Sequence, residues 1–165
     1  MKTGRPPNWN PVAALCHDVW TDVVPLASKG RIVVPVSVRS RLPWLANREG
    51  GLLGITETGR FAELMPWEPH GRQAMEAVRR AIDAADATER GELALAAMDR
   101  YLRLTSDGAG RPLLPGALVS HLDAEASSCV RVFMRDARLW LWSERQWQAE
   151  RARRIAWLAE REALP

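Results

Sequence analysis

The chain has 165 residues, enough for one ordinary domain that buries roughly 70% of the surface of its unfolded chain, so its core needs no covalent staple. Its two cysteines exclude a disulfide framework, and no apolar run forms a signal sequence or approaches the roughly 20 residues of a membrane helix, so we expect a cytoplasmic protein. The net charge of +3 is uneven: residues 1–50 hold seven basic side chains against three acidic ones, which favours a polyanionic partner, with an ordinary solvated surface as the alternative.

Residues 1–20 are the first predicted segment. Pro6, Pro7 and Pro11 predict an extended, poorly ordered arm rather than a packed element.

Residues 21–66 form the first predicted structural unit. Strands over 23–26 and 31–34 flank a Ser28-Lys29-Gly30 turn, and Pro35 ends the second strand and begins a helix over 36–42. A hairpin follows, with strands at 52–56 and 61–65.

Residues 67–100 are rich in Ala, Arg, Glu and Met and predict helices between two units. An apolar stripe at three- and four-residue spacing predicts a face turned toward a core; its members are Ala74, Ala77, Val78, Ala81 and Ile82. Gly91 predicts a break before a second helix over 92–100.

Residues 101–148 repeat the order of the first unit. A tight turn from Asp107 to Arg111 leads to a short strand that Pro115 ends, a helix over 116–122, and a hairpin with strands at 129–134 and 139–142. Ser143, with Gln146 three residues later, predicts the start of a final helix whose end covers 149–165. Its Trp147, Ile155 and Leu158 are expected to face inward.

The two units share a sequence pattern. Gly30-Arg31-x-x-x-Pro35 aligns with Gly110-Arg111-x-x-x-Pro115 at an offset of 80 residues. In the second copy Asp107 and Arg111 can meet across the turn by a charge-assisted hydrogen bond, as a structural pair or as part of a site, whereas Ala27 replaces the aspartate in the first copy.

This repeated Asp-x-x-Gly-Arg-apolar-apolar-apolar-Pro unit, followed by a short helix, resembles the MraZ family of the MraZ/AbrB superfamily of bacterial transcriptional regulators. The resemblance extends from about Asp22 to about Trp147. It implies an α+β fold: one swapped-hairpin β-barrel formed by two interlocked strand-strand-helix-strand-strand repeats, with additional helices between the repeats and at the C-terminus, as a single structural domain.

The resemblance also implies a function and a site. The chain is expected to bind promoter repeats in double-stranded DNA as a homo-oligomer, in a ring as the family does, and to lie in the cytoplasm at the nucleoid, most simply as a repressor. The family's DNA-contacting positions fall here on Lys29, Arg31, Arg39 and Arg41, whereas Asp107 and Arg111 form a structural turn pair. Ala117, Leu118, Val119, Ser120 and His121 replace the arginine-containing turn in the second repeat.

Catalysis is not expected. His17, His70 and His121 are isolated, and the sequence holds no metal-ligand spacing, phosphate loop or nucleophile elbow, so no catalytic residue, metal, cofactor, small-molecule substrate or membrane partner is predicted. Eight tryptophans against one tyrosine favour a protein interface. An oligomeric scaffold that has lost DNA binding, as Ala27 and the arginine-poor second helix would allow, is therefore the alternative to a regulator.

Overall fold

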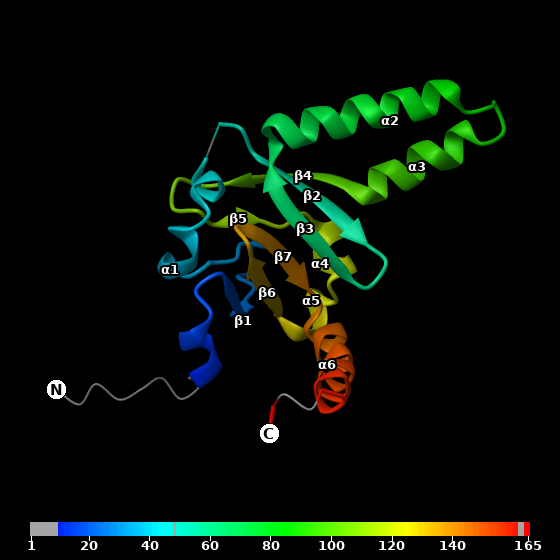
Figure 1. Cartoon of the computed structure of the whole chain (residues 1–165). Coiled ribbons are helices and arrows are strands. Elements are labelled where there is room, and N and C mark those ends of the chain that lie inside the picture. The colour runs from blue at the N-terminus through cyan, green and yellow to red at the C-terminus, as the bar shows by residue number, and fades with distance from the viewer. Residues whose placement is uncertain (1–9, 48, 162–163) are drawn as a thin grey trace.

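The computed structural model describes residues 10–47, 49–161 and 164–165, and it shows an α+β protein (Figure 1). The described strands are β1 (Val19–Pro25), β2 (Leu52–Glu57), β3 (Phe61–Pro66), β4 (Tyr101–Ser106), β5 (Pro112–Leu113), β6 (Cys129–Arg135) and β7 (Arg138–Trp142). The described helices and helical turns are η1 (Pro11–Leu15), α1 (Val36–Arg39), η2 (Pro43–Ala46), η3 (Trp67–Gly71), α2 (Arg72–Ala84), α3 (Arg90–Arg100), α4 (Gly116–His121), α5 (Ala124–Ser127) and α6 (Glu144–Ala159).

The strands form one antiparallel sheet that curls into a half-barrel, in the order β1-β6-β7-β3-β2-β4-β5. The segments 32–45 and 114–124 pack into its concave side, and their apolar side chains complete the core. Ile32, Val34, Leu42, Leu118 and Leu122 are each at most 1% exposed. Burial of this kind supplies the main stabilisation of the fold.

The two halves of the chain exchange strands. β1 of the first half pairs with β6 of the second, from Val19 opposite Arg135 to Pro25 opposite Cys129. β4 of the second half pairs with β2 of the first, and β3 pairs with β7 to join the two hairpins. Each half therefore supplies the neighbour that the other half's hairpin needs.

The predicted strand over 31–34 is wrong. Arg31 makes an isolated bridge to Leu113, flanked by hydrogen bonds from Ile32 N to Pro112 O and from Leu114 N to Gly30 O. The chain then turns inward to bury the side chains of Ile32 and Val34, so the backbone leaves the ladder after one bridge.

Other predicted boundaries also need correction. η1 and β1 begin within the predicted arm, of which residues 1–9 lie outside the described part. The helix expected over 36–42 is the single turn α1, and Gly91 lies inside α3 rather than at a break. The hairpins β2–β3 and β6–β7 and helix α4 occur where the sequence predicts them.

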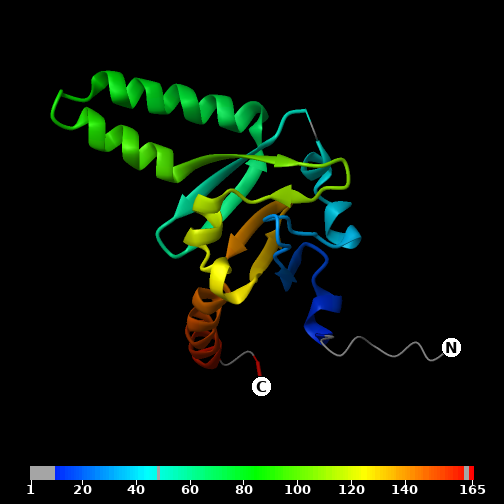
Figure 2. The ribbon, with the colours of Figure 1, turned by 180° about the vertical axis from the view of Figure 1, so that it is seen from behind.

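Helices α2 and α3 form a hairpin that projects from one end of the half-barrel (Figures 1 and 2). The predicted inward stripe on α2 does not reach the main core: Ala77 and Ala81 are exposed, and no residue of α2 or α3 is fully buried. Away from the base of the hairpin, where α3 meets β2, each helix packs mainly on the other, which explains the difference.

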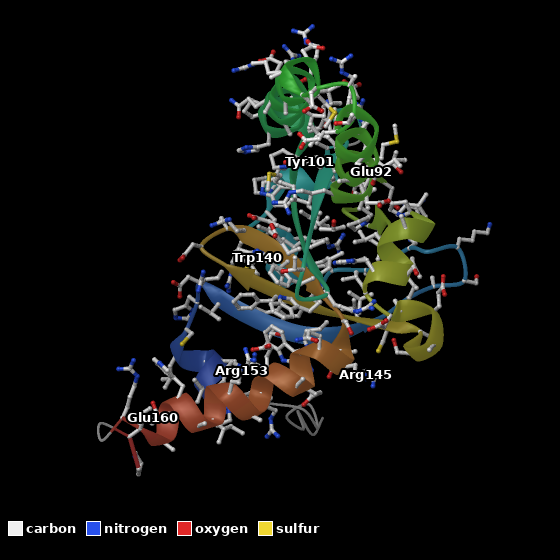
Figure 3. All side chains as sticks on the ribbon, turned by 90° about the vertical axis from the view of Figure 1, so that its right-hand side faces the viewer. Glu92, Tyr101, Trp140, Arg145, Arg153 and Glu160 are labelled. Carbon is white, nitrogen blue, oxygen red and sulfur yellow. The ribbon has the colours of Figure 1, made fainter. Side chains whose placement is uncertain are left out.

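Helix α6 begins as predicted, because the Ser143 hydroxyl accepts a hydrogen bond from Gln146 N at 3.3 Å. Trp147 packs on the sheet, but Ile155 and Leu158 are 53% and 41% exposed, so the expectation that they face inward is wrong. The second half of α6 extends beyond the sheet, as Figure 3 shows from Arg145 to Glu160. No helix in the described ranges is long and apolar enough to cross a membrane.

Candidate nucleic-acid interface

Two turns of the same backbone form, one from each repeat, build the candidate site. In the first turn Ala27 N donates to Arg31 O at 2.9 Å and Gly30 N to Ala27 O at 2.8 Å. In the second turn Asp107 N donates to Arg111 O at 3.4 Å and Gly110 N to Asp107 O at 3.0 Å. Gly30 and Gly110 adopt φ values of +80° and +68°, which glycine accepts without steric cost.

The carboxylate of Asp107 organises the second turn. Its Oδ1 accepts hydrogen bonds from the backbone N–H groups of Ala109 and Arg111, both at 3.0 Å. Arg111 Nε lies 2.6 Å from Asp107 Oδ2, so the two residues that the sequence pairs are in contact.

The same carboxylate also holds the arginine of the first turn. Arg31 Nη1 lies 3.6 Å from Asp107 Oδ2 and donates to Arg111 O at 3.0 Å. The sequence analysis did not predict this contact between the repeats. Ala27 could have indicated it, because it leaves Arg31 without a carboxylate in its own turn.

Partial burial disfavours the charged form of Asp107. The backbone N–H and guanidinium of Arg111 and the N–H of Ala109 outweigh it and hold the pKa of this carboxyl below its ordinary value. Asp107 therefore stays ionised at neutral pH and presents a fixed negative charge between two guanidinium groups.

Arg39 lies beneath the second turn. Its Nη1 donates to Ala109 O and its stem packs against Gly110, whose position could not carry a Cβ without approaching Arg39 Cδ to 2.9 Å. Its Nε is buried and has no hydrogen-bond partner among the described residues. At the equivalent position eighty residues later, Val119 packs against the core. The second turn is therefore supported by an arginine of the first repeat, and the first turn has no equivalent support from position 119.

Lys29 and Arg41 are exposed, Lys29 in the first turn and Arg41 just after α1. The structure thus brings Arg31, Arg39 and Arg111 to the Asp107 turn, while Lys29 and Arg41 lie on segments adjoining Arg31 and Arg39. Among the residues that the structure describes, Asp107 is the one carboxylate that forms ion pairs with this cluster, so the cluster carries a net positive charge.

The histidines do not converge on this site. His121 Nε2 lies 2.8 Å from Glu57 O and 3.2 Å from Phe61 O, at the β2–β3 turn. Within the described residues no group of three or more His, Cys, Asp or Glu side chains could hold a metal ion.

No protein-family model and no curated protein sequence matches this chain.

Proposed function

We propose that the protein is a DNA-binding transcriptional regulator of the MraZ/AbrB type, acting as an oligomer on promoter repeats at the nucleoid. The exchange of strands between the two halves supports a swapped-hairpin barrel as its fold. The clustering of Arg31, Arg39 and Arg111 around one turn is the observation that carries the functional proposal.

The arrangement suits a nucleic-acid contact because its arginines are held and partly exposed. The side chains of Arg31 and Arg111 are 34% and 47% exposed, and each is anchored at one edge by Asp107. An anchored guanidinium loses less conformational entropy when its remaining N–H groups bind a phosphate or a guanine edge. Asp107 therefore acts as a positioning residue for both.

Arg39 has two roles in this proposal. Its guanidinium supports the turn through Ala109 O. Because Arg39 also lies beside Gly110, its charge would be close to the DNA phosphates that Lys29, Arg31 and Arg41 would contact. Because one chain offers few such groups, affinity at cellular salt requires several subunits on repeated elements.

Gel-shift titration tests the proposal, with duplexes selected from a random library by the wild-type protein. Arg31→Ala and the double variant Lys29→Ala/Arg41→Ala are expected to weaken binding at least tenfold and to lower the slope of log K against log salt by about one per lost phosphate contact. Arg79→Ala, which removes an exposed arginine from α2, is the control and should bind as the wild type does.

Failure of the wild type to select any duplex, or full affinity in the Arg31→Ala variant, would reject the DNA site. The second candidate is an oligomeric scaffold without DNA affinity. The large apolar side chains exposed on α3 and α6 favour it. An oligomer that passes through a heparin column unretained would support it.

A further inference from the structure

Two apolar helix faces lie uncovered at opposite ends of the molecule. On α3, Leu95 and Met98 are 57% and 67% exposed, and on α6, Ile155 and Leu158 are 53% and 41% exposed. Each pair has a spacing of three residues, so each forms a continuous strip along its helix. In Figure 3, Glu92 of α3 and Arg153 of α6 mark the two ends, with the sheet between them.

The two strips carry opposite charges on their flanks. Helical spacing places Glu92 and Asp99 beside the Leu95–Met98 strip, and both are exposed. It places Arg151 and Arg154 beside the Ile155–Leu158 strip, where Arg151 is exposed and Arg154 stacks on Trp147 at 4.3 Å. The α3 face is thus apolar with an acidic flank, and the α6 face is apolar with a basic flank.

We infer that α6 of one copy packs on α3 of a second copy, in a head-to-tail interface between identical chains. The two faces cannot meet within one chain, because the sheet separates them (Figures 1 and 3). Pairing α3 with α3 would oppose acidic flanks, and pairing α6 with α6 would oppose basic flanks, so charge selects the mixed pair.

A head-to-tail contact has a definite consequence for assembly. It leaves one unused α3 and one unused α6 at the ends of every open chain of subunits, so it continues until a ring closes or a filament grows. The inference deepens the proposed oligomer and rests on it, but it uses none of the arginines around Asp107.

Sedimentation velocity of the full chain tests it with two double variants. Leu95→Gln/Met98→Gln removes the α3 strip and Ile155→Gln/Leu158→Gln removes the α6 strip; glutamine preserves helix propensity and charge. Each variant alone is expected to sediment as an 18.5 kDa monomer under conditions where the wild type is larger. Val12→Gln/Leu15→Gln, at residues 60% and 80% exposed on η1, is the matched control and should assemble as the wild type does.

Mixing the two variants is the decisive step. The α3 variant keeps an intact α6 and the α6 variant keeps an intact α3, so an equimolar mixture should form a dimer of twice the monomer mass and stop there. A monomeric wild type, a variant with wild-type mass, or a mixture that stays monomeric would each overturn the inference. Circular dichroism confirms that the variants are folded.

DNA binding is read separately. A wild type that assembles through these faces without binding DNA would reject the proposed function and keep the inference. Double variants that keep the wild-type mass and bind DNA as the wild type does would do the reverse.

Discussion

Arg31 of the first repeat lies 3.6 Å from Asp107 of the second, on the same carboxylate that Arg111 contacts at 2.6 Å. The aspartate missing at Ala27 is therefore supplied across the repeat boundary. One carboxylate contacts both repeated arginines, which explains how Arg31 is held although its own turn has no acidic residue at position 27.

Asp107→Ala should lower the stability of the fold clearly and weaken the proposed DNA binding per folded molecule only slightly. It removes the acceptor of two backbone N–H groups and the contacts to both arginines, so we expect a melting temperature several degrees lower. Asp107→Asn keeps an acceptor oxygen, so its melting temperature should lie between those of the wild type and Asp107→Ala. Calorimetry and gel shift per folded molecule measure these effects; unchanged melting with abolished binding would assign Asp107 to DNA contact instead.

Acid should weaken the anchor of α6 through Glu144. Burial disfavours its charge, but hydrogen bonds from Arg131 at 2.7 and 2.8 Å and from Gln148 outweigh this and lower the pKa of the carboxyl. A carboxyl whose pKa is lower in the folded than in the unfolded protein stabilises the fold fully at pH values above its unfolded-state pKa. It loses this effect as the pH falls through its folded-state pKa, here from about pH 4.5 downward.

Chemical denaturation between pH 3 and 7 should therefore show a shallower acid loss of stability for Glu144→Gln than for the wild type. Glu125→Gln, at an exposed position on α5, should follow the wild-type curve. Equal acid slopes for all three proteins would contradict the role of Glu144.

The two turn glycines should differ in their tolerance of alanine. Both have positive φ, which costs alanine about 1 kcal/mol. A Cβ at Gly30 would also lie 2.9 Å from the backbone oxygen of Leu114, whereas at Gly110 it would lie 2.9 Å from Arg39 Cδ, a side-chain atom that can shift more readily than backbone. Urea unfolding should give a loss of about 2 kcal/mol or more for Gly30→Ala and about 1 kcal/mol for Gly110→Ala.

Gly91→Ala should raise the stability of the protein, in contrast to the two turn variants. Nothing lies within 4 Å of a Cβ at this position inside α3, so the variant should be more stable than the wild type by about 0.5 kcal/mol. If Gly30→Ala and Gly110→Ala lost equal stability, the predicted clash between the new Cβ at position 30 and the Leu114 carbonyl would be contradicted.

Two tryptophans of α6 should contribute unequally to stability. Trp147 packs against Phe133 and Trp142, with ring centroids 5.6 and 5.5 Å away, whereas Trp157 is 55% exposed. In dilute solution Trp147→Ala should cost about 2 kcal/mol, because the site is only partly buried, and Trp157→Ala less than about 0.5 kcal/mol. A larger cost at Trp157 would show that the end of α6 packs on its own chain.

Local pattern predicted the hairpins and α4 because their strand and helix periods and flanking turns are encoded within a few residues. It failed for residues 31–34, whose apolar side chains satisfy a strand pattern but go into the core. Whether Ile155 and Ala77 are buried depends on whether their helices lie against the core or project from it, and local periodicity carries no information on this. The Arg31–Asp107 contact likewise depends on how the repeats interlock.

The exchange of strands also sets the timing of folding during synthesis. Thr21 of β1 donates its hydroxyl hydrogen bond to Val132, 111 residues later, so β1 waits for its partner on the order of ten seconds while the ribosome completes β6. During that interval an unpaired strand is open to pairing with other nascent chains. Two features of β1 reduce this risk: Pro25 has no N–H to offer, and the Asp22 carboxylate accepts the N–H of Val23 at 2.8 Å.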